Sequence, residues 1–260
     1  MVVSGLRDSP GGPSEDLADR EAVIWHELEC GGYRADLPLW HELAAAAPPD
    51  GPILDVGAGS GRVALELARA GHEVTALDLD ERLLRALAGR IGSLPLQTVH
   101  ADARSFRLAR RDYALCIAPM QTVQLLGGAD GRIAFLRHAR AHLRRGGLLA
   151  CAILGELEPF DCREGGPAPA PERARVDGRL YLSRALRVEL TRASVVLERE
   201  RVVRGGTGAR APERDVIELD RLTATRLRRE GREARLTPLP TRSIAATDQH
   251  VGSSVVVLRA

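Results

Sequence analysis

Three alternating glycines follow an acidic residue within the first third of the chain. The stretch contains Asp55, Gly57, Gly59 and Gly61. Glycine adopts positive φ angles at little cost and carries no side chain, so a ligand can approach such a loop closely. Nucleotide sites and many cofactor sites share this kind of loop. The spacing therefore indicates a binding loop without yet identifying its ligand.

A second acidic residue, Asp78, ends the apolar stretch 73–78. An aspartate at that end of a second strand can accept hydrogen bonds from both ribose hydroxyls. The alternative is an N-cap for the helix that follows. Asp80 fits the cap better because it directly precedes Glu81 and the helical pattern, which leaves Asp78 for a ribose.

The elements that position these residues are a strand, a turn and a helix. Residues 53–56 are mostly apolar and β-forming, and they run straight into the glycines. Apolar residues then recur at helical spacing over 63–68, and Gly71 stands where a helix C-cap is expected. The helix N-terminus would point its unpaired N–H groups at the ligand.

The segment 54–62 reads LDVGAGSGR and resembles the first motif of class I S-adenosylmethionine-dependent methyltransferases, approximately L-D-x-G-x-G-x-G. The dinucleotide fingerprint G-x-G-x-x-G has a wider spacing. In the resembling family the glycine turn passes under the amino-acid and ribose end of the cofactor. Asp102 follows a third predicted strand, 96–99, where that family has an acidic residue that accepts the adenine amino group. A solvent-facing turn is the alternative for Asp102.

The resemblance implies S-adenosylmethionine as the cofactor. It assigns cofactor binding to Asp55, Gly57, Ala58, Gly59, Asp78, Leu79, Asp102, Ala103 and Pro119.

Acceptor and catalytic candidates come from three other segments. Tyr33 lies between two predicted N-terminal helices, where small-molecule members of the family often bring a tyrosine near the sulfonium; packing between the helices is an equal alternative. Gln121 and Gln124 follow the fourth predicted strand and are candidate substrate contacts, with a capping or surface role favoured for Gln124. His250 could act as a base, although a structural histidine is the stronger expectation.

Composition excludes several classes of activity. The 260 residues carry a formal net charge of +2, and only 3% of them are aromatic, which is unlike a nucleic-acid-binding surface. The chain has no lysine and no asparagine, so Schiff-base enzymes and Walker-type phosphate loops are excluded. Residues 118–121 read APMQ where amino-methylating nucleic-acid enzymes have N/D-P-P-Y/F, and the chain has no Pro-Cys pair. We expect a small-molecule substrate and no nucleic acid.

The four cysteines are scattered without metal-ligand spacing, which favours free thiols and no metal site. The sequence shows neither a signal-peptide pattern nor an apolar run that could span a membrane. We expect a cytoplasmic protein without membrane contact; the sequence does not indicate an oligomeric state.

The expected fold is α/β, with a doubly wound, mostly parallel, seven-stranded sheet whose last strand is reversed. The predicted helix from Asp130 ends at 144–147, prolines interrupt regular structure over 155–178, and 236–244 forms one strand. The predicted segments are a flexible tail (1–14), an N-terminal helical cap (15–50), a cofactor-binding core (51–154), a β-rich lid insertion (155–220), and a C-terminal helix with the last two core strands (221–260).

The sequence thus predicts an S-adenosylmethionine-dependent methyltransferase that acts on an N or O atom of a small molecule. In-line displacement at an activated methyl carbon mainly requires alignment of the nucleophile and exclusion of water. One alternative is a protein of the same fold that binds or regulates without catalysis. An NAD-dependent oxidoreductase is a further alternative that the glycine spacing disfavours.

Overall fold

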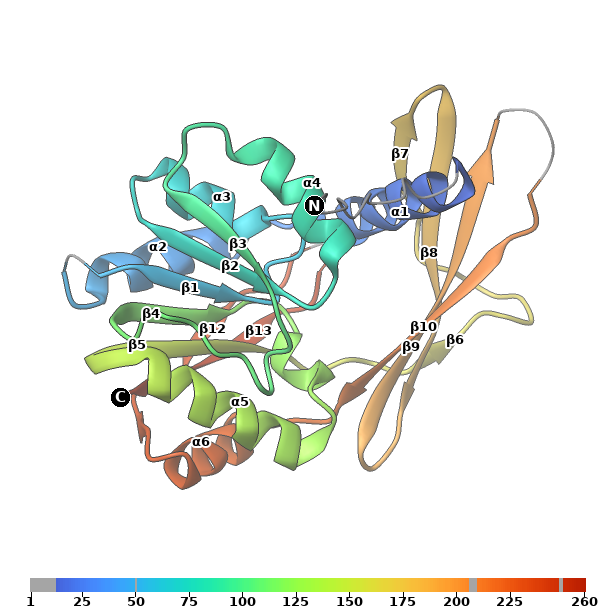
Figure 1. Cartoon of the computed structure of the whole chain (residues 1–260). Coiled ribbons are helices and arrows are strands. Elements are labelled where there is room, and N and C mark those ends of the chain that lie inside the picture. Colours follow the sequence, from blue (N-terminus) through green and yellow to red (C-terminus); the bar gives the residue numbers. More distant parts are fainter. Residues whose placement is uncertain (1–12, 50, 206–209, 248–249) are drawn as a thin grey trace, which may run out of the picture.

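The computed structural model describes residues 13–49, 51–205, 210–247 and 250–260. The predicted flexible tail therefore lies outside the described residues except for 13 and 14, where the first helix begins. The chain forms a helix-covered central sheet and a second, antiparallel sheet beside it (Figure 1).

The central sheet has the strand order β11-β13-β5-β4-β1-β2-β3, with β12 also paired to β13. The strands from β5 to β3 are parallel, and β13 runs antiparallel to β5. Their bounds are β1 Ile53–Val56, β2 Val74–Asp78, β3 Leu96–His100, β4 Tyr113–Ala118, β5 Leu143–Leu154, β11 Thr237–Pro238, β12 Arg242–Ile244 and β13 Ser253–Arg259. The predicted doubly wound sheet with a reversed last strand is confirmed.

Helices cover both faces of this sheet because its buried strands are apolar on both sides. Neighbouring residues of β1 show the division: Ile53 packs in one apolar cluster and Leu54 in the other. The first cluster includes residues of α2 (Leu37–Ala46), α3 (Arg62–Arg69) and α4 (Glu81–Ile91). The second includes residues of α5 (Gly128–His142) and α6 (Ala224–Glu233).

Two predicted boundaries were wrong. Helix α5 ends at His142, and residues 143–147 already belong to β5, with Tyr113 paired to Leu143 and an irregular register before Leu115. The segment 236–244 forms two short strands, β11 and β12, because Pro240 lacks the N–H that a continuous ladder needs. The central sheet therefore has eight strands rather than seven.

The N-terminal helix α1 (Pro13–His26) continues into a short π-helix, η1 (Glu27–Gly31). It contacts α4 on one side, where Arg85 donates to Asp19 at 2.6 Å. On the other side it contacts the second sheet, where Arg20 donates to Asp177 at 2.6 Å. This helix therefore joins the central sheet's layer to the second sheet (Figure 1).

The second sheet has the order β10-β9-β8-β6, with β7 paired to β8. Its strands are β6 Phe160–Asp161, β7 Glu172–Val176, β8 Arg179–Leu190, β9 Ser194–Arg204 and β10 Glu213–Asp220. Two of them, β6 and β7, form inside the proline-containing segment where no regular element was expected. Both lie at the outer side of β8, the position where a strand tolerates nearby prolines.

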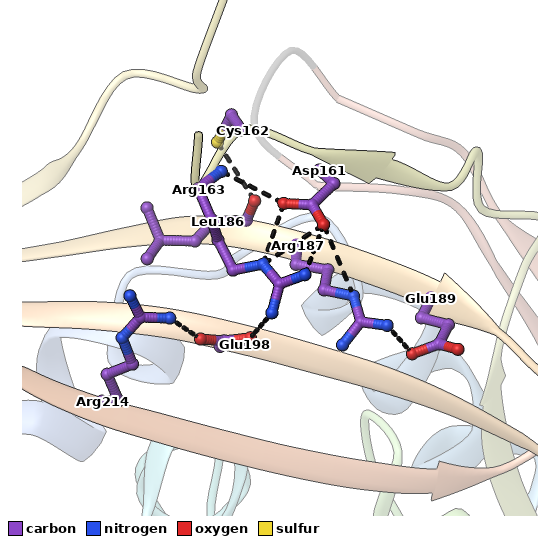
Figure 2. A network of polar contacts seen from close by, with 8 residues as sticks. All are labelled: Asp161, Cys162, Arg163, Leu186, Arg187, Glu189, Glu198 and Arg214. Atoms are coloured by element: carbon purple, nitrogen blue, oxygen red, sulfur yellow. Dashed lines mark hydrogen bonds and ion pairs between the residues drawn. The ribbon is translucent and has the colours of Figure 1, made fainter. Parts of the chain in front are cut away.

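The two faces of this sheet differ because side chains alternate along a strand. One face carries a network of ion pairs that connects Asp161, Arg163 and Glu198 and continues to Arg187 and Arg214 (Figure 2). The other face carries an apolar cluster that contains Val188, Val195, Leu219 and their partly buried neighbours. That apolar face is turned toward the central sheet and lines the cavity described below.

No helix of the described residues is long and apolar enough to cross a membrane. The four cysteines are free thiols. Within the same described ranges, no three side chains of His, Cys, Asp or Glu gather as a metal site would require.

Candidate active site

A cavity of about 950 Å³ separates the two sheets. It begins at the carboxyl ends of β1, β2 and β4, where an open α/β sheet binds its ligands, and it reaches the apolar face of the second sheet. Its wall includes the glycine loop, the end of α1 with η1, and strands β8, β9 and β10. Most predicted site residues line this cavity; the exceptions are Gly59 and Gln124.

The glycine loop has the conformation that its sequence predicts. Gly57 and Gly59 have φ angles of 71° and 55°, which residues with side chains rarely adopt. A Cβ atom at Gly57 would also lie 2.5 Å from Oγ1 of Thr122. The N–H groups of Gly57 and Ala58 both donate to the carbonyl of Leu77, at 2.8 and 3.1 Å. The loop is thus fixed against the end of β2.

Asp55 is 1% exposed, and neither of its carboxylate oxygens has a hydrogen-bond partner among the described residues. Burial raises its pKa to about 7, although the nearby Arg62 lowers it. A buried carboxylate without a partner is costly. Because Asp55 also lines the cavity, it is suited to a cationic or hydrogen-bond-donating group of a ligand.

Asp78 is the last residue of β2 and contacts the same loop. Its Oδ2 accepts a hydrogen bond from the N–H of Gly59 at 2.7 Å, and its Oδ1 accepts one from the N–H of Asp80 at 2.8 Å. Each oxygen keeps a second lone pair for a ligand hydroxyl. Asp80 caps α4 as expected, accepting from the N–H of Arg82. Leu79 is 62% exposed and lies at the cavity rim.

Asp102 and Ala103 also line the cavity, and Asp102 has a partner that the sequence analysis did not include. The Arg104 guanidinium donates to its two oxygens at 3.0 and 2.6 Å. This hydrogen bonding lowers the pKa of Asp102 and keeps it ionised. A carboxylate offers about four acceptor positions, so Asp102 can accept a ligand amino group beside Arg104.

The segment after β4 contributes Pro119, Met120 and Gln121 to the cavity wall. The carbonyl of Pro119 accepts a hydrogen bond from the hydroxyl of Thr122 at 2.9 Å, and Met120 adopts a φ of 54°. This strained turn presents Gln121 to the cavity.

The prediction that Gln124 contacts substrate requires correction. Its Nε2 donates to the carbonyl of Asp220 at 2.9 Å, and its Oε1 accepts from the N–H of Leu154 at 2.7 Å. The side chain is 2% exposed and is not part of the cavity wall. Gln124 therefore connects the ends of β5 and β10, a buried structural role that differs from the capping or surface role favoured from the sequence.

Tyr33 and His250 meet at the cavity, with ring centroids 4.7 Å apart and planes inclined by 37°. The Tyr33 hydroxyl is buried and has no partner among the described residues. Burial lowers the pKa of His250, and the charges of Arg62 and Arg199 lower it further. A neutral imidazole and a free phenol hydroxyl therefore share one wall.

A buried ion pair between Arg62 and Asp36 supports the part of the wall that Tyr33 forms. Arg62 donates to both oxygens of Asp36, at 2.5 and 2.7 Å, and to the carbonyl of Tyr33 at 2.9 Å. Trp40 donates to the same carboxylate at 2.8 Å. The Arg62 guanidinium also lies 5.3 Å from the centre of the Tyr33 ring. These contacts join the N-terminal helices to the first turn of α3.

The sequence analysis missed several polar residues of the cavity. Glu29, Arg199 and Arg201 form a charged end, where Arg201 donates to Glu29 at 2.8 and 2.6 Å. Burial tends to raise the pKa of Glu29, but the two arginines and Ser183 outweigh it and lower the pKa. In the sequence, Glu29 lies in a helical pattern and both arginines alternate along a predicted strand, so all three have the pattern of exposed charged residues. His26, discussed below, also lies in a helical pattern and was not singled out.

The strand order, the reversed β13 and the ligand cavity at the carboxyl ends of the parallel strands define the class I methyltransferase fold. The family model described as "Methyltransferase domain" matches residues 53–147. These residues are thus a methyltransferase domain, and they include the glycine loop, Asp78 and Asp102.

Solved structures support the fold over almost the whole chain. The chain resembles CalS10, an amino pentose methyltransferase from Micromonospora echinaspora, with 20% identity, a TM-score of 0.65, and coverage of 98% of this chain and 100% of that one. It also resembles the sugar N-methyltransferase KedS8 from Streptoalloteichus, with 16% identity, a TM-score of 0.68, and coverage of 100% and 98%.

Similarity to curated relatives is confined to a short segment. An rRNA adenine N-6-methyltransferase from Corynebacterium diphtheriae is 34% identical over 58 residues, which are 22% of this chain and 23% of that protein. The matched segments cover between 23% and 33% of the curated relatives' length. Each of these matches spans at most 32% of this chain and 33% of the relative, so these relatives are evidence for part of the chain only.

Proposed function

We propose that this protein is a methyltransferase that uses S-adenosylmethionine and transfers the methyl group to an amine of a small molecule. When bound, S-adenosylmethionine supplies a methyl group already activated on a sulfonium. The observation that carries the proposal is the single cavity that contains Asp55, Asp78, Asp102, Tyr33 and His250. The residues proposed for the cofactor and those proposed for the acceptor line the same cavity, which supports the proposal.

The residues of the loop fit this cofactor. The unpartnered Asp55 carboxylate can pair with the ammonium group of the amino-acid end, and Asp78 can accept from the ribose hydroxyls. Asp102 can accept from the adenine amino group beside Arg104. Leu79 and Ala103 supply apolar contact at the rim. Glycine at 57 and 59 lets the loop adopt positive φ angles and leaves room for the side chains of Thr122 and His26, which pack where a Cβ atom would lie.

The second half of the cavity fits an acceptor molecule. The neutral His250 can take a proton from a protonated amine, which frees the lone pair that attacks the methyl carbon. The Tyr33 hydroxyl and Gln121 can hold the acceptor group in line. Apolar residues of the second sheet, among them Val188 and Leu197, exclude water from this end.

An amine is favoured over a hydroxyl because a buried neutral histidine is a sufficient base for an ammonium group, whereas an alcohol is a much weaker acid. The names of CalS10 and KedS8 point the same way, since they describe an amino pentose methyltransferase and a sugar N-methyltransferase. Amino sugars are therefore the first substrates to test. We also propose that the protein acts in the cytoplasm, without nucleic acid.

The test is transfer of a radiolabelled methyl group from S-adenosylmethionine to a panel of amino sugars, their hydroxyl analogues and an rRNA transcript. We expect label on an amino sugar, and none on its hydroxyl analogue or on RNA. Labelled RNA would contradict the small-molecule proposal. Cofactor binding without transfer to any of these acceptors would favour the non-catalytic alternative.

A further inference from the structure

His26 is the last residue of α1 and lines the cavity next to the glycine loop. Its Nδ1 lies 3.1 Å from the hydroxyl oxygen of Ser60. Its ring lies directly on Gly59, since a Cβ atom at Gly59 would be 2.5 Å from both Cε1 and Nε2 of the imidazole. The Cε1–Nε2 edge of His26 therefore packs on the glycine loop, beside the space that the amino-acid end of the cofactor would occupy.

The loop itself has few hydrogen-bond donors left. The N–H groups of Gly57 and Ala58 donate to the carbonyl of Leu77, and that of Gly59 donates to Asp78. The N–H of Gly61 donates to the carbonyl of Ala58 at 2.9 Å. Four amides of the glycine loop are thus already paired within the protein. These four cannot donate to a ligand carboxylate, which would have to find its donor at the remaining loop amide, that of Ser60, or on a side chain.

The amino-acid end of S-adenosylmethionine carries an ammonium group and a carboxylate on the same carbon. The carboxylate of Asp55 is suited to the ammonium group, so the ligand carboxylate must lie close by. Arg62 also lines the cavity, but its guanidinium is paired with Asp36. His26 is left as the side-chain donor beside Gly59.

The imidazole of His26 is in the right protonation state for this role. Burial lowers its pKa, and the smaller opposing effects of Glu27 and Asp78 do not restore it, so the ring is neutral near pH 7. When Nδ1 accepts a hydrogen bond from the Ser60 hydroxyl, the proton resides on Nε2. The Ser60 hydroxyl can donate to Nδ1 or accept from it, and the tautomer in which it donates leaves Nε2 as the donor.

We propose that His26 is a positioning residue that donates a hydrogen bond from Nε2 to the carboxylate of the cofactor's amino-acid end. This inference rests on the proposed function, because it assumes that the cavity binds S-adenosylmethionine. It adds that α1 takes part in cofactor binding through a side chain, and that Ser60 acts through His26.

Two ligands that differ only at the amino-acid end test the inference. S-adenosylhomocysteine carries that end, and 5′-methylthioadenosine lacks it. Calorimetric titration of His26→Ala should show the Kd for S-adenosylhomocysteine raised roughly 10- to 100-fold, as expected for a lost bond to a charged group. The Kd for 5′-methylthioadenosine should change less than about two-fold, since its contacts lie elsewhere.

Two conservative variants separate a donor from a purely structural ring. The amide nitrogen of His26→Gln corresponds to Nε2 and should restore part of the affinity for S-adenosylhomocysteine. That of His26→Asn corresponds to Nδ1, so this variant should keep the contact with Ser60 and remain weak. Asp78→Ala serves as the comparison, because loss of a ribose contact should weaken both ligands.

Equal weakening of both ligands by His26→Ala would overturn the inference, since the ring would then only support the loop. Unchanged affinity for both would overturn it as well. If the wild-type protein binds neither ligand, the proposed function fails and the inference with it, and the wild-type titration alone distinguishes that case.

Discussion

The rings of Tyr33 and His250 lie 4.7 Å apart on the cavity wall, although the two residues come from opposite ends of the chain. The backbone carbonyl of Tyr33 accepts a hydrogen bond from Arg62. His250 belongs to the turn before β13. The N–H of His250 donates to the hydroxyl of Thr247 at 3.0 Å. The fold therefore brings a phenol and an imidazole to one place on the cavity wall.

His250→Ala should remove the acidic limb of the kcat/KM profile. Burial and the charges of Arg62 and Arg199 lower the pKa of His250. The wild-type enzyme should therefore still hold a neutral base at pH 6.5 and lose activity only when the pH falls further. The kcat/KM of the variant should be lower by roughly 100-fold at pH 7.5 and should depend less on pH. Methyl transfer to the accepted amine, measured between pH 5 and 8, checks this.

Tyr33→Phe is the matched control for that experiment, since it keeps the ring beside His250. Its pH profile should retain the acidic limb. An acidic limb that survives in His250→Ala would show that the imidazole is not the base.

Asp78→Ala should weaken binding of S-adenosylhomocysteine roughly 10- to 100-fold, because a hydrogen-bond acceptor for the ribose hydroxyls is lost. Asp78 also holds the N–H of Gly59, so the loop loses a support as well. Glu81→Gln is the control, because Glu81 lies one turn away with a side chain that is 63% exposed. Calorimetric titration measures both. Unchanged affinity in Asp78→Ala would remove this residue from the site.

Asp55→Asn should stabilise the ligand-free protein more at pH 8 than at pH 5. Burial raises the folded-state pKa of Asp55 from 3.8 to about 7, so the folded protein retains a proton that the unfolded chain has lost. Stability therefore falls as pH rises from about 4 through about 7. The increase in the free energy of unfolding that Asp55→Asn produces should be larger at pH 8 than at pH 5 by roughly 2–3 kcal/mol, because each pH unit between 5 and 7 contributes about 1.4 kcal/mol.

Urea unfolding of both proteins at the two pH values gives this difference. A gain that does not depend on pH would mean that Asp55 is already ionised in the ligand-free protein.

Asp36→Asn should destabilise the protein by roughly 3–5 kcal/mol, because it leaves the buried charge of Arg62 without its partner. Asp36 is 1% exposed and also accepts from Trp40. Glu66→Gln is the control, since Glu66 pairs with Arg69 on the surface of α3 and should cost less than about 1 kcal/mol. Urea unfolding at pH 7.5 measures both, and equal costs would argue against a structural role for the Asp36 pair.

The sequence predicted those parts of the protein that depend on short-range pattern. Strand β1 has the predicted bounds, 53–56, because apolar residues end abruptly at a glycine. Asp78 and Asp80 occupy the predicted strand end and helix cap, because the helical pattern begins directly after them at Glu81. The resemblance in the glycine loop then implied a mostly parallel sheet with a reversed last strand, which no local pattern contains.

What the sequence did not predict depends on contacts between distant segments. Gln124 was a candidate substrate contact, but β10 and β5 come together around its amide and bury it. Glu29 has the composition of a surface residue, yet Arg201 of the second sheet pairs with it in the cavity wall. Burial of a polar side chain is decided by its partner, and the partner lies far away in the sequence.

The central claim is that the cavity binds the adenosyl-methionyl ligand rather than a dinucleotide. Titration of the wild-type protein with S-adenosylhomocysteine and, separately, with NAD tests it most directly. We expect saturable one-site binding of S-adenosylhomocysteine with a matching rise in Tm, and no binding of NAD. Binding of NAD without binding of S-adenosylhomocysteine would contradict the account.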